Sequence, residues 1–213
     1  MVRNIIFDFG NVLFDLDLGA FEREMNALLD SDFEAVRERL LRSRVFELYE
    51  TGGLSTEEFV EMLAGGVAHL EGMPHRPRLI AAWNAILLGM PAPRFDMLLR
   101  LRQRYKVFLL SNINDLHERW IADYMQREHG LADYESRYFD GVYFSHLIRL
   151  RKPAPEVFEY VLADAEILPQ ETMFFDDLPE NVAAAQHLGI QGVWHAPGTD
   201  IESRLLDMGV LSG

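Results

Sequence analysis

Short apolar runs, each followed closely by a polar residue, constrain the fold of this chain more than any other feature. The clearest runs are residues 5–7, 107–110, 142–144 and 173–175, and residues 192–194 form a weaker fifth. Each run is too short for a helix and does not alternate between apolar and polar residues, so the pattern predicts strands covered on both faces. Helix-like segments at 155–165 and 179–187 separate the later runs. Alternating strands and helices are typical of a parallel sheet.

Residues 15–90 follow the first predicted strand and have a different pattern. Their apolar side chains recur at the spacing of one helix face, as at Phe21 and Met25, which predicts helices. Ser55 and Glu58 have the spacing of a capping box at a helix start. We therefore predict a Rossmann-like α/β fold in which helices flank a parallel sheet and a small helical cap is inserted after the first strand. The predicted boundaries are residues 1–14 and 91–213 for the core and 15–90 for the cap.

Composition excludes several classes of function. The formal net charge of -14 argues against a nucleic-acid partner, because such proteins concentrate Lys and Arg. The chain has no cysteine, which excludes disulfides, thiolate catalysis and cysteine-based zinc sites. The seven histidines show no metal-ligand spacing, and we interpret them as surface or core residues. With no bilayer-spanning segment or signal-peptide pattern, we expect a cytoplasmic globular protein without a membrane partner.

Polar residues gather where the predicted strands end. In an open parallel sheet, ligands bind beyond the carboxyl ends of the strands, so side chains at these positions converge. The residues at these ends are Asp8, Ser111, Asn112, Asp176 and Asp177, and Lys152 follows the third strand by a few positions. Three carboxylates in one partly desolvated crevice repel each other and raise their own pKa values. Mg²⁺ removes that conflict and bridges to a substrate phosphate.

The remaining polar groups complete a site for a phosphoryl group. The Ser111 hydroxyl and the Lys152 ammonium suit the phosphoryl oxygens, and we expect the backbone N–H groups of Gly10, Asn11 and Asn112 to add an anion nest. Each residue alone has an ordinary explanation as a turn former, helix cap or surface side chain. Adjacent acids beside a buried strand bring no packing benefit, and the joint occurrence in order favours a site.

In this arrangement the sequence resembles the haloacid dehalogenase-like (HAD) hydrolases. Residues 8–12 match the first motif of that family, 110–112 the second, 151–153 the third, and the stretch from Phe175 to Asn181 the fourth. The predicted cap falls where the family places a small helical cap. Three short segments, at positions 10–11, 50–55 and 83–85, are similar to the bacterial α-D-glucose-1-phosphatase branch.

The resemblance implies a catalytic role for Asp8 and a Mg²⁺ cofactor. Asp8 would attack phosphorus and form an aspartyl-phosphate that water later cleaves. The Asp8 carboxylate, the Gly10 carbonyl and Asp176 would hold the metal, with Asp177 helping through water. We therefore predict a Mg²⁺-dependent phosphatase acting on a small phosphorylated metabolite, with its oligomeric state left open.

The resemblance also assigns the groups that hold the phosphate. Ser111 and Lys152 would grip the phosphoryl oxygens while charge redistributes. Asn181 would steady this arrangement from the start of the next helix, although a capping role there is equally compatible with its position.

Gly10 departs from the family pattern. Most phosphatases of the family carry a second Asp there, which serves as general acid and then base. Without it, we expect a substrate whose leaving oxygen tolerates charge, so a sugar 1-phosphate is favoured over a 6-phosphate, unless Asp15 or Asp17 supplies the proton. There are three alternative functions. The first is a non-catalytic phosphate- or partner-binding protein, for which Gly10 is the best argument. The others are a phosphoryl-transferring mutase and a metal-independent dehalogenase, and Asp176 and Asp177 argue against the dehalogenase.

Overall fold

A five-stranded parallel sheet forms the centre of the protein. The computed structural model describes residues 1–29, 33–67 and 76–211, and its sheet has the order β5-β4-β1-β6-β7. The strands are β1 (Asn4–Phe7), β4 (Lys106–Ser111), β5 (Gly141–Phe144), β6 (Thr172–Asp176) and β7 (Gln191–Trp194). All four neighbouring pairs are parallel. The predicted α/β class is confirmed, and all five apolar runs lie in strands.

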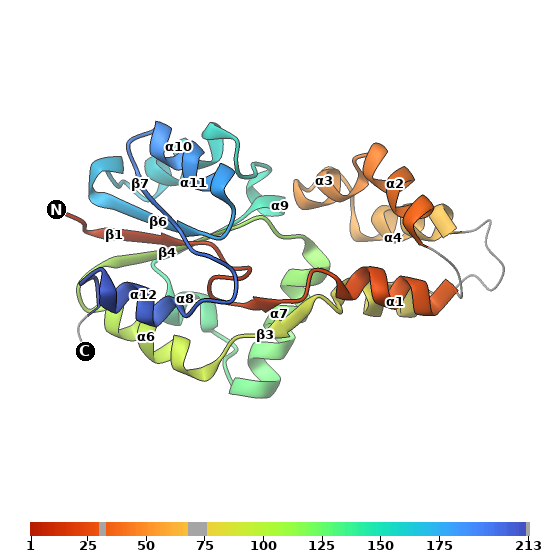
Figure 1. Ribbon diagram of the computed structural model, residues 1–213, viewed down its shortest axis with the longest axis horizontal. Coiled ribbons are helices and arrows are strands. Elements are labelled where there is room, and N and C mark those ends of the chain that lie inside the picture. The colour runs from red at the N-terminus through yellow and green to blue at the C-terminus, as the bar shows by residue number, and fades with distance from the viewer. Residues whose placement is uncertain (30–32, 68–75, 212–213) are drawn as a thin grey trace.

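Helices cover both faces of this sheet (Figure 1). One face carries α6 (Ala92–Arg102), α7 (Asp115–His129), α8 (Tyr134–Tyr138) and α12 (Ile201–Asp207); the other carries α10 (Pro155–Asp164) and α11 (Pro179–His187), and the short α9 (Ser145–Ile148) follows β5. In β1, Ile5 and Phe7 pack into one apolar cluster and Ile6 into another. Burial on both sides explains why the strands lack polar alternation. No helix within the described ranges has the length and apolar character needed to cross a bilayer.

The helical cap is inserted after β1 and has a core of its own. It contains α1 (Ala20–Leu29), α2 (Glu34–Arg42), α3 (Val45–Glu50), α4 (Thr56–Val67) and α5 (Arg76–Asn84). Phe21, Tyr49 and Trp83 belong to one buried cluster within it. The predicted capping box is confirmed: the Ser55 N–H donates to Glu58 Oε2 over 2.8 Å, and the Glu58 N–H donates to Ser55 Oγ over 3.2 Å.

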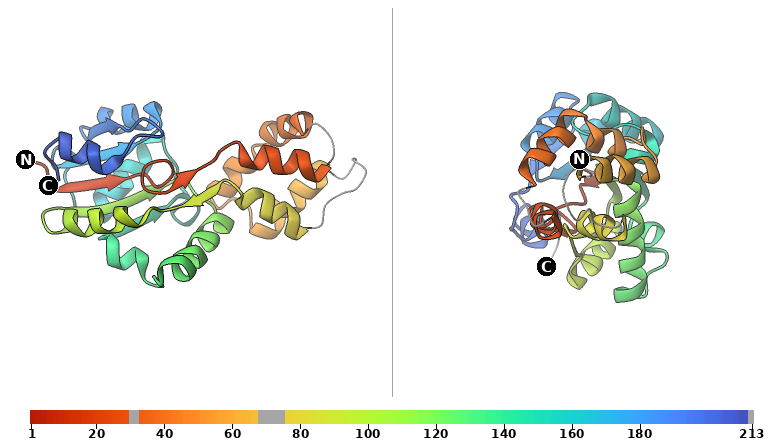
Figure 2. Two further views of the ribbon diagram at one scale, coloured as in Figure 1. Left: turned by 60° about the horizontal axis from the view of Figure 1, so that its bottom comes forward. Right: turned by 90° about the vertical axis from the view of Figure 1, so that its right-hand side faces the viewer.

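A short antiparallel ribbon joins the cap to the core. Strand β2 (Asp15–Leu16) pairs with β3 (Leu87–Gly89), and Figure 2 shows these two segments running side by side between the sheet and the cap. The sequence pattern predicted helices throughout 15–90, so the ribbon was missed. Strands of two and three residues are too short to show a periodicity.

The cap also contacts the core directly. The turn after α3 places Gly52 at φ 65°, and a Cβ there would lie 2.3 Å from the His146 carbonyl oxygen of α9, so only glycine permits this approach. On α5, the Trp83 indole N–H donates to Asn114 Oδ1 over 3.3 Å. These contacts hold the cap against the carboxyl end of the sheet.

Candidate active site

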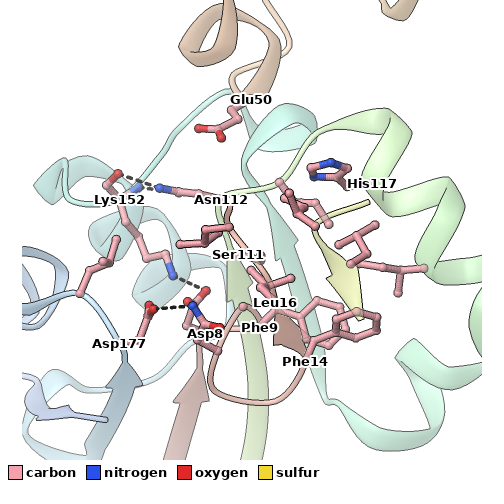
Figure 3. A pocket seen from close by; sticks show the side chains of 18 of the residues that line it. Asp8, Phe9, Phe14, Leu16, Glu50, Ser111, Asn112, His117, Lys152 and Asp177 are labelled. Carbon is pink, nitrogen blue, oxygen red and sulfur yellow. Dashed lines mark hydrogen bonds and ion pairs between the residues drawn. The ribbon is translucent and has the colours of Figure 1, made fainter. Parts of the chain in front are cut away.

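A cavity of about 280 Å³ lies at the carboxyl end of the sheet, between core and cap. Figure 3 shows several of its side chains, with the Lys152 ammonium directed toward Asp8 and the Asn112 side chain directed toward the backbone of Lys152. Eight of the nine predicted site residues line it: Asp8, Gly10, Asn11, Ser111, Asn112, Lys152, Asp177 and Asn181. Asp176, the ninth, ends β6 and lies beneath the pocket with no exposed surface. The structure therefore brings all nine together.

Lys152 links two of the carboxylates. Its side chain is almost fully buried, and its ammonium donates to Asp8 Oδ1 over 2.6 Å and to Asp176 Oδ2 over 2.7 Å. Although burial disfavours its charge, these two carboxylates raise the pKa of Lys152. The lysine therefore stays positive at neutral pH.

Asn112 fixes the backbone of Lys152. Asn112 Oδ1 accepts from the Lys152 N–H over 2.9 Å, and Asn112 Nδ2 donates to the Lys152 carbonyl over 2.9 Å. These two bonds tie the loop before α10 to the end of β4. The Asn112 side chain therefore positions the lysine, a role that the sequence did not suggest.

Asp176 is held by donors from the start of α11. Its Oδ1 accepts from the Leu178 N–H over 2.8 Å and from Asn181 Nδ2 over 2.9 Å. Asn181 is itself buried. The Asn181 amide contacts both carboxylate oxygens of Asp176, at 2.9 and 3.1 Å, and so helps to position that side chain.

Asp8, Asp176 and Asp177 form a carboxylate cluster that could hold a metal. One carboxylate oxygen from each residue lies within 4.8 Å of the corresponding oxygens of the other two. Burial raises the pKa of Asp8 to about 7, against the attraction of Lys152 and with added repulsion from Asp176. Burial likewise raises the pKa of Asp177, opposed by a hydrogen bond from Asn11. Three carboxylates against one ammonium leave two negative charges, which a divalent cation balances.

The side of the pocket next to Gly10 is filled by an apolar group. A Cβ on residue 10 would lie 2.7 Å from Leu16 Cδ1. The place where a side chain at position 10 would begin is therefore occupied by the end of the Leu16 side chain. The structure thus replaces the family's usual carboxylate with an apolar contact.

Asp15 and Asp17, the other proton donors considered, are engaged elsewhere. Asp15 pairs with Arg94 at 2.7 Å, and Asp17 forms a short ion pair with Arg23 at the surface. Within the described chain, neither lines the pocket. Their positions give no support to a role in proton transfer.

Sequence reasoning missed two pocket residues at the cap interface, His117 and Glu50. Asn114 caps α7 by accepting from the His117 N–H over 3.1 Å, and His117 stacks on Trp83 with ring centroids 5.0 Å apart. Burial lowers the pKa of His117 to about 4, so the ring is neutral at pH 7. Glu50, at the end of α3, also lines the pocket. The Asn–x–x–His spacing of Asn114 and His117 is compatible with the start of a helix. The contacts of these residues with the cap domain are long-range, and local sequence does not predict them.

Comparison with known sequences identifies a family. A model of the haloacid dehalogenase-like hydrolases matches residues 2–189. The chain is 29% identical over 207 residues to a D-ribitol-5-phosphate phosphatase of Bacteroides thetaiotaomicron, an alignment covering 96% of this chain and 97% of that protein. It is 30% identical over 196 residues to a sesquiterpene phosphatase of Aspergillus oryzae, with 88% and 87% covered.

Solved structures of HAD family proteins are similar to this chain in fold and in sequence. A HAD family enzyme from Bacteroides thetaiotaomicron, in complex with magnesium and inorganic phosphate, superposes with a TM-score of 0.82 at 32% identity, covering 94% of this chain and 97% of that one. A HAD-like hydrolase from Porphyromonas gingivalis gives a TM-score of 0.80 at 30% identity, with 98% of each chain covered. The likeness extends over core and cap together.

Proposed function

The chain belongs to the haloacid dehalogenase-like hydrolase family and is a phosphatase of that family, and we propose that it hydrolyses the phosphate ester of a small sugar or polyol with Mg²⁺. The observation that carries the proposal is the buried ammonium of Lys152, bonded to Asp8 and Asp176 beside a third carboxylate. This arrangement combines a nucleophile, a metal-binding cluster and a phosphate-binding cation at one point. A non-catalytic binding protein has no need for all three.

The carboxylate cluster fits Mg²⁺ in both charge and donor type. We assign the Asp8 carboxylate, the Gly10 carbonyl, Asp176 and Asp177 as the groups that would hold the ion, directly or through water. All are oxygen donors, which Mg²⁺ prefers. When bound, the ion supplies positive charge that balances the cluster and orients the phosphoryl oxygens.

Asp8 acts as the nucleophile in the proposed reaction. A carboxylate oxygen of Asp8 attacks phosphorus, and the bond from phosphorus to the ester oxygen breaks, so that the alcohol departs with that electron pair and takes a proton from water. Water then attacks phosphorus of the aspartyl-phosphate, which releases inorganic phosphate and restores Asp8. Ser111, Lys152 and the N–H group of Asn112 hold the phosphoryl oxygens through both steps. The Asn11 N–H, which the sequence predicted for the anion nest, instead donates to the Phe14 carbonyl over 2.8 Å.

The helical segment is proposed to close the site. The assigned boundaries are residues 1–14 and 91–213 for the core and 15–90 for the cap. Trp83 of α5 and Glu50 of α3 both line the pocket, so the cap supplies part of its wall. A closed cap excludes water from the phosphoryl group during transfer.

Two features support a small hydroxylated substrate. The cavity of about 280 Å³ lies near the lower end of the range for small-molecule sites. The relative from Bacteroides thetaiotaomicron is a D-ribitol-5-phosphate phosphatase. The absence of a side chain at Gly10 favours an acidic leaving oxygen, such as that of a sugar 1-phosphate, and this preference stays a prediction.

A panel of phosphate esters tests the proposal. Inorganic phosphate release is measured with and without Mg²⁺ for sugar 1-phosphates, sugar 6-phosphates and polyol 5-phosphates. We expect Mg²⁺-dependent release from at least one class, with 1-phosphates ahead of 6-phosphates. Failure to hydrolyse any member with Mg²⁺ present would refute the proposed function, and a preference for 6-phosphates would refute the leaving-group argument alone.

A further inference from the structure

Glu50 is a pocket carboxylate that the proposed chemistry does not use. It is the last residue of α3 in the cap, and it lines the same cavity as Asp8 and Lys152. Of the acidic residues in the described part of the chain that line this cavity, Glu50 alone lies outside the carboxylate cluster of Asp8, Asp176 and Asp177. The proposed nucleophile and metal site therefore do not account for a carboxylate at this position.

The core fixes Glu50 in place at both its backbone and its side chain. The buried Ser145 hydroxyl donates to the Glu50 carbonyl over 2.6 Å. Glu50 Oε2 lies 3.1 Å from an Arg151 guanidinium nitrogen, and Arg151 precedes Lys152 and also lines the pocket. Burial raises the pKa of Glu50, opposed by the attraction of Arg151. The carboxylate is thus poorly hydrated and retains acceptor positions beyond the one that Arg151 uses.

The wall around Glu50 is largely apolar. On the cap and ribbon side, the cavity is lined by Phe14, Leu16, Leu18, Trp83, Ile86 and Leu87. Against such a wall, Glu50 and Arg151 form the one charged pair remote from the carboxylate cluster among the lining residues that the structure describes. A carboxylate accepts hydrogen bonds from hydroxyl groups, and a guanidinium donates to their oxygens. The pair therefore suits a hydroxylated leaving group.

A role as the missing general acid does not fit the geometry. Figure 3 shows Glu50 at the cap side of the pocket and Asp8 at the opposite side, with Asn112 and Lys152 between them. A general acid must lie within hydrogen-bond reach of the departing oxygen, which is adjacent to the phosphorus that Asp8 attacks. Glu50 instead faces the part of the leaving group remote from phosphorus.

We propose that Glu50, held by Arg151, is a specificity-determining residue that accepts hydrogen bonds from hydroxyl groups on the leaving group of the substrate. This inference rests on the proposed phosphatase function and narrows its substrate class to phosphate esters of polyhydroxylated alcohols. Hydrogen bonds of this kind form in both the ground state and the transition state. Their loss therefore appears mainly in KM.

Matched substrates and variants test this role. The substrates are a pentitol 5-phosphate and n-pentyl phosphate, which has the same carbon chain without the hydroxyl groups. The variants are Glu50→Gln and the control Glu47→Gln, which lies one turn earlier on α3, pairs with Arg44 and does not line the pocket. kcat and KM are measured for each with Mg²⁺, and circular dichroism checks that each variant is folded.

We expect Glu50→Gln to lower kcat/KM for the pentitol phosphate by about 10- to 100-fold, mainly through KM, as expected for a lost hydrogen bond to a charged group. The same variant should lower kcat/KM for pentyl phosphate by less than about threefold, and Glu47→Gln should leave the ratio of the two substrates at the wild-type value. An equal loss on both substrates would show a structural role and overturn the inference, as would an unaltered ratio. If wild-type protein hydrolyses both esters and Glu50→Gln leaves the ratio of their kcat/KM values unaltered, the inference about Glu50 fails and the phosphatase function stands. If wild-type protein hydrolyses neither these two esters nor any member of the ester panel, both fail.

Discussion

At the scale of single residues, position 10 is where this chain departs from the usual pattern of its family. Glycine there leaves the backbone carbonyl available to a metal but provides no acid for the departing oxygen. The neighbouring Leu16 side chain fills the space that a Cβ would enter. General acid catalysis is typically worth about 10²–10⁴-fold, so its absence should make turnover depend strongly on the leaving group.

A pair of variants tests this dependence. Rates are measured for phosphate monoesters that differ in the acidity of the leaving alcohol. Wild-type protein should show a steep dependence, and Gly10→Asp/Leu16→Ala should flatten it, because the second change removes the 2.7 Å contact that a Cβ at position 10 would make. Leu16→Ala alone is the control and should stay steep. A shallow dependence in wild-type protein would show that another group already supplies the proton.

At the scale of elements, the β2–β3 ribbon and the start of α7 set how the cap meets the core. The ribbon carries the chain out to the cap and back. Tyr49 and Trp83 of the cap reach the first turn of α7: the Tyr49 hydroxyl accepts from the Leu116 N–H over 3.1 Å, and Trp83 bonds Asn114. A substrate held between core and cap would bind to both and strengthen this closure.

Hydrogen exchange should report the closure. With Mg²⁺ and vanadate as a phosphate analogue, we expect slower amide exchange in α3 and α5, because opening of the cap must then break ligand contacts. Amide exchange in α10, which packs on the sheet and is not part of the cap, should change little and serves as the internal control. An identical pattern with and without the analogue would indicate a rigid attachment rather than a closing cap.

The same elements show what sequence can and cannot predict. The strands were predictable because burial on both faces leaves continuous apolar runs such as 107–110, and the polar residues at their ends follow from the geometry of a parallel sheet. The ribbon was not predictable, because two or three residues carry no periodicity. The placement of Glu50 and His117 in the pocket depends on how the cap docks, which is a long-range contact that local patterns do not encode.

At the scale of the whole molecule, a net charge of -14 is combined with three carboxylates in one buried cluster. Burial raises the pKa of Asp8 to about 7, so without metal its contribution favours the folded state at low pH and is lost as pH rises through that value. A bound cation offsets this loss of stability at higher pH, because it favours the ionised carboxylates. Metal binding and folding stability are therefore linked.

This linkage predicts a pH-dependent stabilisation by Mg²⁺. At ~100 times the dissociation constant, the gain in unfolding free energy is about 2.7 kcal/mol. The rise in melting temperature should be larger at about pH 8 than at about pH 5, because protons compete with the metal for carboxylates. Asp176→Ala should abolish the rise, and Glu159→Ala, an exposed acid on α10, should keep it. A wild-type melting temperature that Mg²⁺ leaves unmoved at both pH values would contradict the metal site.

The turnover of Asp8→Asn with Mg²⁺ and the best ester of the panel tests the central claim most directly. An amide is a poor nucleophile, so we predict a folded protein, by circular dichroism, whose rate of phosphate release falls by more than about 10³-fold. A folded Asp8→Asn protein that keeps more than about a tenth of the wild-type rate would contradict the assignment of Asp8 as the nucleophile.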